Sequence, residues 1–106
     1  MNKEKEHEIY EKEVAVILAD FLNYTYEDKT VVSEFTDRFT RKFALGQEQG
    51  CVVRIALTSL YVNYRHYGEV PDCFAGFYLQ IIVHVLLKDW NALEGMSGLL
   101  EQWSFE

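Results

Sequence analysis

The sequence is short of residues that interrupt helices. It contains one proline and six glycines in 106 residues, and no stretch is rich in proline, glycine or serine. This scarcity argues against a disordered chain and against a turn-rich β-sandwich. The hydrophobic share of 49% and the charged share of 25% are typical of a globular protein with one core. We therefore expect a single helical domain over residues 1–106, with residues 1–8 frayed.

Positive charge is also scarce. The chain has 10 Lys and Arg against 17 Asp and Glu, for a net charge of −7. Such a chain is poorly suited to neutralise a phosphate backbone or to dock on an anionic bilayer, so neither nucleic acid nor membrane is an expected partner. Arg38, Arg41 and Lys42 form a possible basic patch, which we interpret as a solvated helix face. The alternative is that acidic and basic surfaces meet across an interface with another chain.

Cysteines and targeting signals point to an ordinary intracellular protein. Cys51 and Cys73 stand in apolar surroundings without a CxxC motif, so we expect buried, reduced thiols. The N-terminus lacks the apolar core of a secretory signal. The longest apolar run is too short to span a bilayer and contains Gln80 and His84. The expected location is the cytoplasm.

Signatures of catalysis are missing as well. The chain has no Gly-rich phosphate loop, GxSxG or HExxH motif. Glu4 and His7 have the spacing of a di-iron ligand pair, but no second copy occurs, so ordinary surface charge is the expected role. Cys73 and His84 are eleven residues apart on one predicted helix, too far for a nucleophile to contact its base. We expect no enzymatic activity, cofactor or metal site.

The most informative feature that is present is the apolar segment 71–88. Its polar or small residues recur every four positions, at Asp72, Gly76, Gln80, His84 and Lys88. Because a helix returns nearly to the same side after four residues, the segment is predicted to be a central helix. It should be buried over most of its circumference and carry one thin non-apolar stripe.

Four further segments have helical spacing. The predicted helices cover residues 3–24, 29–44, 51–66, 71–88 and 91–103. Segment 51–66 is rich in β-branched and aromatic residues, which suit a strand, but its length and spacing favour a helix. Gly46 and Gly68 are expected to provide the left-handed residues that end the second and third helices. The predicted fold is an all-α compact bundle of about five helices with short connections.

The helices over 3–24, 51–66 and 71–88 are apolar around most of their circumference, which exceeds what so small a domain can enclose. Surplus apolar surface marks an interaction site. The primary hypothesis is a small acidic helical interaction module, a homodimer or higher oligomer that acts as an adaptor or regulator. Another protein is a second possible partner. The possible interface residues are Phe35, Phe39, Tyr61, Tyr64, Gln80, His84 and Trp103.

Two alternative functions remain open from the sequence. One is an acidic inhibitor, of the immunity, antitoxin or phage type, that blocks a basic or nucleic-acid-binding target. The other is a ligand- or metal-binding bundle around Cys73, Gln80 and His84. For His84 itself, a structural role with a hydrogen bond to Gln80 or to a backbone carbonyl is favoured over a role as ligand or proton carrier.

Overall fold

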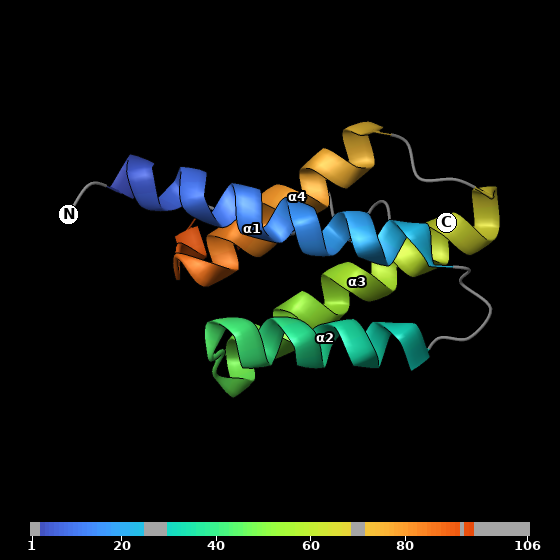
Figure 1. The fold of residues 1–106 in the computed structure, drawn as a ribbon, viewed down its shortest axis with the longest axis horizontal. Helices are drawn as coiled ribbons and strands as arrows, with labels where there is room; N and C mark the ends of the chain where they lie inside the picture. The colour runs from blue at the N-terminus through green and yellow to red at the C-terminus, as the bar shows by residue number, and fades with distance from the viewer. Residues whose placement is uncertain (1–2, 25–29, 69–71, 92, 95–106) are drawn as a thin grey trace.

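The protein is described here by a computed structural model that covers residues 3–24, 30–68, 72–91 and 93–94. Four helices account for most of these residues: α1 (Lys3–Asn23), α2 (Thr30–Phe43), α3 (Gln47–Tyr67) and α4 (Asp72–Leu86) (Figure 1). No strand occurs within the described ranges. The all-α prediction is therefore confirmed, and segment 51–66 is helical. Of the predicted fifth helix, only residues 91 and 93–94 are described, and they are helical.

The four helices pack in a ring. α4 packs against both α1 and α3, α3 also packs against α2, and a smaller contact joins α1 to α2. Figure 1 shows α1 and α4 side by side, with α3 and α2 beneath them. In this order α1 and α3 occupy opposite corners, so their outward faces lie on different sides of the protomer.

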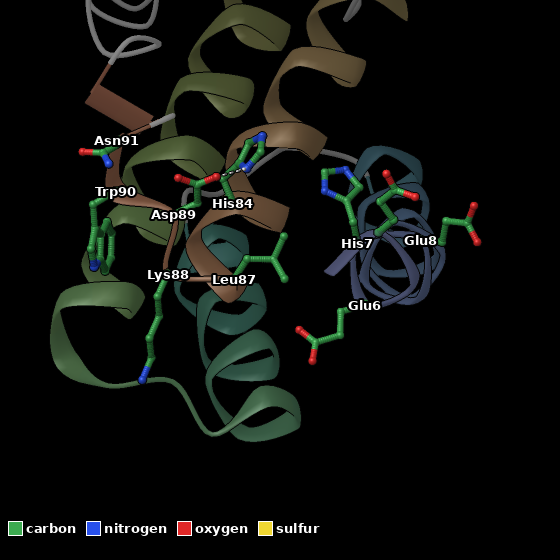
Figure 2. A pocket seen from close by; sticks show the side chains of 10 residues that line it. Glu6, His7, Glu8, His84, Leu87, Lys88, Asp89, Trp90 and Asn91 are labelled. Atoms are coloured by element: carbon green, nitrogen blue, oxygen red, sulfur yellow. Dashed lines mark ion pairs between the residues drawn. The ribbon is translucent and has the colours of Figure 1, made fainter. Parts of the chain in front are cut away.

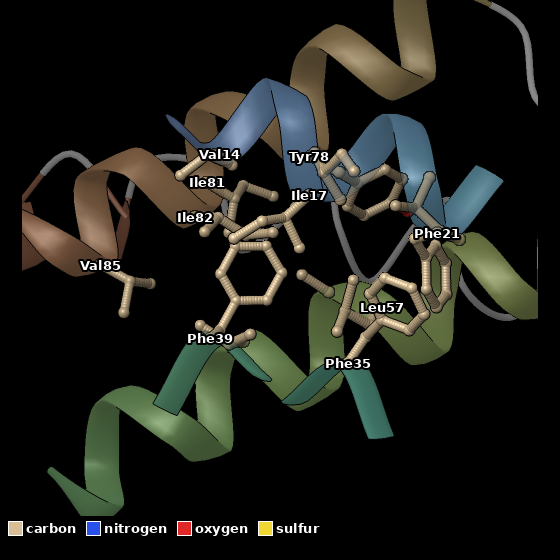
Figure 3. Close-up of a cluster of buried hydrophobic side chains, with 14 of the residues drawn as sticks. Val14, Ile17, Phe21, Phe35, Phe39, Leu57, Tyr78, Ile81, Ile82 and Val85 are labelled. Atoms are coloured by element: carbon tan, nitrogen blue, oxygen red, sulfur yellow. The ribbon is translucent and has the colours of Figure 1, made fainter. Parts of the chain in front are cut away.

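The core fills the centre of this ring with side chains from all four helices (Figure 3). Phe35 and Phe39 of α2 are buried, as the narrow apolar stripe of this helix predicts. Phe35 meets Phe21 of α1 edge to face, with ring centroids 5.2 Å apart. Burying such rings is the main favourable contribution to folding in a domain of this size.

The predicted helix over 71–88 is present as α4, although it occupies one corner of the ring rather than its centre. Ile81, Ile82, Val83 and Val85 of α4 are all buried, although they point in several directions around the helix. Its stripe is the less buried side: Gln80 and His84 are half-buried, and Gly76 and Lys88 are exposed. The stripe residue Asp72 lies in α4, but its side chain is outside what the structure describes.

Residues 3–8, expected to be frayed, form the first turns of α1. Glu6 and His7 are partly buried there, whereas Ile9 and Val16 are exposed. The first half of α1 therefore packs through Tyr10 and through polar side chains, and its other apolar residues are exposed.

The expectation for Gly46 is wrong. The left-handed residue that ends α2 is Ala44, with φ of 52°, and the Leu45 N–H closes the helix on the Thr40 carbonyl at 3.1 Å. Gly46 has φ of −74° and instead precedes α3, where its N–H donates to Gln49 Oε1 at 3.0 Å. Gly68 does end α3 in the left-handed conformation, as predicted, with φ of 79°.

The expectation of two buried cysteines is also wrong in part. Cys51 is exposed on α3 because it lies on the side of the helix that faces away from α2 and α4. The side chain of Cys73 is outside the described residues. Among the described residues, no helix combines the length and apolar character needed to cross a bilayer.

Candidate functional site

A polar cluster joins α1 to the stripe of α4. His7 Nε2 lies 3.1 Å from Gln80 Oε1, and Gln80 Nε2 donates to Glu11 Oε2 at 2.6 Å. Because the amide nitrogen of Gln80 donates to Glu11, its oxygen is the acceptor, and His7 must donate through Nε2. The stripe residue Gln80 is thus a partner of α1 within the protomer.

His84 belongs to the same cluster. Its ring meets that of His7 edge to face, with centroids 5.5 Å apart. Its Nδ1 is buried, makes no hydrogen bond among the described residues, and lies 3.7 Å from Asp89 Oδ2. Asp89 is held there by the end of α4, because Lys88 turns into the left-handed conformation and the Asp89 N–H returns to the His84 carbonyl at 2.9 Å.

A depression of about 800 Å³ opens beside the two histidines (Figure 2). Its walls come from the first turns of α1 and from the end of α4 with the residues that follow it. It is lined by Glu4, Glu6, His7, Glu8, His84, Leu87, Lys88, Asp89, Trp90 and Asn91. The surroundings are thus acidic, with one exposed indole.

Chemically, this arrangement offers hydrogen-bonding groups and negative charge but no obvious catalytic pair. The two imidazoles contact each other, and neither is hydrogen-bonded to a hydroxyl or thiol in the described residues. No group of three or more metal-ligating side chains occurs in the part of the chain that the structure describes. The cluster therefore resembles a structural contact between helices, placed at the rim of a depression.

The structure separates most of the residues proposed for an interface. Phe35 and Phe39 are buried within the protomer, so they present no surface to a partner. Tyr61 and Tyr64 are half-buried against the core, on a different helix from Gln80 and His84. Trp103 lies outside the described residues. The six of these residues that the structure describes do not form one surface.

One residue of the possible basic patch, Arg38, interacts with side chains of the same chain. Arg38 Nη2 lies 2.9 Å from Asp20 Oδ2 of α1, and its guanidinium lies over the Phe35 ring at 5.4 Å. This acidic–basic pair lies within the protomer, between α1 and α2, whereas the alternative drawn from the sequence was a contact with another chain. Lys42 lies over the Phe43 ring at 5.9 Å, and Arg41 is exposed.

A ridge of uncharged residues runs along the outward face of α3. It consists of Cys51, Ile55, Thr58 and Val62, all exposed. The relative solvent exposure is 48% for Ile55 and 40% for Val62. The Thr58 hydroxyl already donates to the Arg54 carbonyl at 2.8 Å, so it needs no partner from outside. We call these four residues the α3 ridge.

A second ridge, which includes one lysine, lies on the outward face of α1. It consists of Ile9, Lys12, Val16 and Ala19, all exposed. The relative solvent exposure is 52% for Ile9 and 61% for Val16. We call these four residues the α1 ridge.

Several of these features were not identified from the sequence. His7 was interpreted as surface charge, because nothing in its neighbourhood indicates that it reaches Gln80, 73 residues away. The α3 ridge does have a signal, since Cys51, Ile55, Thr58 and Val62 follow the alternating steps of four and three that mark a helix–helix seam. Comparisons with protein-family models, with curated proteins and with solved structures find no match for this chain.

Proposed function

We propose that this protein is a helical interaction module that associates with copies of itself through the α3 ridge. The observation that carries the proposal is the exposure of Ile55 and Val62 one heptad apart on a helix whose other sides are occupied by α2 and α4. β-Branched residues at alternate seam positions are typical of helices that pair with another helix.

The α3 ridge supports a modest affinity. Fully burying an Ile or Val side chain contributes about 1.5–3 kcal/mol, whereas association costs at least about 4 kcal/mol. Each partner contributes two such residues, and about half of each is already covered within the protomer. The free energy gained by burying the rest exceeds the cost of association by a small amount at most. A surplus of this size corresponds to weak association, with a dissociation constant of about 1 mM or weaker, as suits a reversible adaptor or regulator.

Sedimentation velocity across a concentration series of about 0.05 to 2 mM, which reaches that range, tests the proposal. The wild type should shift from monomer to larger species, and Ile55→Glu should remain monomeric because it places a charge in the seam. Trp90→Glu is the matched control, since it also replaces an exposed apolar residue but lies outside both ridges. A wild type that stays monomeric throughout overturns the proposal.

A second candidate function is the binding of a small organic cation in the depression beside His7 and His84. Its volume lies within the range of small-molecule sites, and an indole beside carboxylates suits a cation. Thermal-shift measurements with a panel of aliphatic and aromatic amines test it, with Trp90→Ala as the variant that should lose the response. The third candidate, an acidic inhibitor of a basic target, is supported by the net charge of −7 alone.

A further inference from the structure

The two exposed ridges differ in the charge around them. α1 carries six acidic and three basic residues, with Glu8 and Glu13 on either side of its ridge. α3 carries one acidic and two basic residues, and both arginines, Arg54 and Arg65, are exposed along one side of its ridge. α1 as a whole is therefore negative and α3 positive, although the α1 ridge itself contains Lys12 and α3 also exposes Glu48.

The two ridges also match in spacing. The α1 ridge advances by steps of three, four and three residues, and the α3 ridge by four, three and four. Each presents two β-branched residues seven apart, Ile9 with Val16 and Ile55 with Val62. Helices with such seams pack side chains of one into gaps of the other, and opposite charges beside the seam select the partner and its orientation.

Pairing two α3 ridges would bring the arginines of both copies to one contact, and pairing two α1 ridges would bring together two helices that each carry an excess of acidic residues. Like charges placed together in this way disfavour both symmetric arrangements. α1 and α3 occupy opposite corners of the ring, so one copy can use both ridges at once without interference (Figure 1).

We infer that the protein assembles head to tail, with the α1 ridge of one copy packed on the α3 ridge of the next. This inference rests on the self-association proposed above and names the surface that the α3 ridge binds. Such a contact is heterologous: it leaves one free ridge at each end of a dimer, so it continues into an open chain or closes into a ring.

A mixing experiment tests the inference. Val16→Glu removes the function of the α1 ridge, and Ile55→Glu removes that of the α3 ridge. Each variant alone should be monomeric, and the two mixed in equal amounts should form a one-to-one heterodimer that grows no further. Circular dichroism of each variant establishes that it remains folded, since both sites are exposed.

Other results of the mixing experiment separate failure of the inference from failure of the proposed function. If Val16→Glu assembles like the wild type and the mixture forms no heterodimer, the contact is α3 with α3, and the inference fails while the proposed function stands. If the wild type does not associate at all, the proposed function itself fails. If Ile55→Glu assembles on its own, the contact is α1 with α1, and that result contradicts both the inference and the proposed function.

A pair of charge-reversal variants makes a second test that does not depend on the apolar residues. Arg54→Glu and Glu8→Lys, both at exposed positions, should each weaken assembly by up to roughly fivefold, in line with surface charge pairs. Raising the NaCl concentration should weaken wild-type assembly as well, because exposed charges are screened. Stronger assembly at high salt would contradict a contact between opposite charges and overturn the inference.

Discussion

His7 of α1 donates a hydrogen bond to Gln80 of α4 across 73 residues of sequence, with 3.1 Å between Nε2 and Oε1. Gln80 also donates to Glu11 at 2.6 Å. One side chain on the thin stripe of α4 thus holds two side chains on consecutive turns of α1. Gln80 and His84, which the sequence indicated as possible interface residues, thus contact α1 of the same protomer.

Removing this side chain should loosen the first half of α1. In Gln80→Ala, two partly buried hydrogen bonds between α4 and α1 are lost, so the free energy of unfolding should fall by about 1–3 kcal/mol. Urea denaturation followed by circular dichroism measures the change. Gln47→Ala, at an exposed position in the first turn of α3, is the control and should change little. A Gln80→Ala variant as stable as the wild type would show that the polar cluster contributes nothing to docking.

Backbone conformation gives a pair of predictions of opposite sign. Ala44 has φ of 52° and Gly68 has φ of 79°, so both helices end in the left-handed region. A Cβ atom there costs roughly 1–2 kcal/mol. Ala44→Gly should therefore stabilise the protein by about 1 kcal/mol, and Gly68→Ala should destabilise it by a similar amount. Differential scanning calorimetry of both variants is the measurement, and a change of the same sign in both would contradict the assigned conformations.

Gly76 offers an independent check on the surface of α4. It lies inside the helix, it is exposed, and a Cβ built on it meets nothing within 4 Å. Gly76→Ala should stabilise the protein by roughly 0.5–1 kcal/mol, because alanine loses less backbone entropy in a helix. It should leave assembly unchanged in sedimentation velocity, since Gly76 belongs to neither ridge. Loss of assembly in this variant would place the subunit contact on α4 instead.

Local patterns predicted the helices well, because each depends on spacing within a few turns. The Phe35 and Phe39 stripe and the burial of Ile81 and Val83 follow directly from helical periodicity. The residues that contact the α4 stripe could not be predicted from helical periodicity. That His7 meets Gln80, and that Arg38 pairs with Asp20, depends on how the helices pack around the ring. The end of α2 was misplaced for a related reason: glycine marks a left-handed residue only statistically, and Ala44 adopts that conformation two positions earlier.

The final prediction concerns Tyr78, whose ring is fully buried in the core. Its hydroxyl makes no hydrogen bond of normal geometry among the described residues. Burial raises the pKa of Tyr78 above its ordinary value of 10.0, and the Ser59 side chain offsets part of that rise. Because folding favours the protonated phenol, its contribution to stability is complete below about pH 10 and is lost as the pH rises through the pKa of the folded state.

Tyr78→Phe should therefore be about as stable as the wild type at pH 7, since it removes a buried polar group without changing the shape of the ring. Above about pH 10 the variant should become the more stable of the two, because the wild type must then ionise a buried phenol or unfold. Urea denaturation at several pH values between about 7 and 11, spanning the ordinary tyrosine pKa, measures the difference. Tyr67→Phe, at an exposed tyrosine, should leave the pH dependence as it is in the wild type. Parallel stability curves for Tyr78→Phe and the wild type would show that the Tyr78 hydroxyl is not held in a buried site.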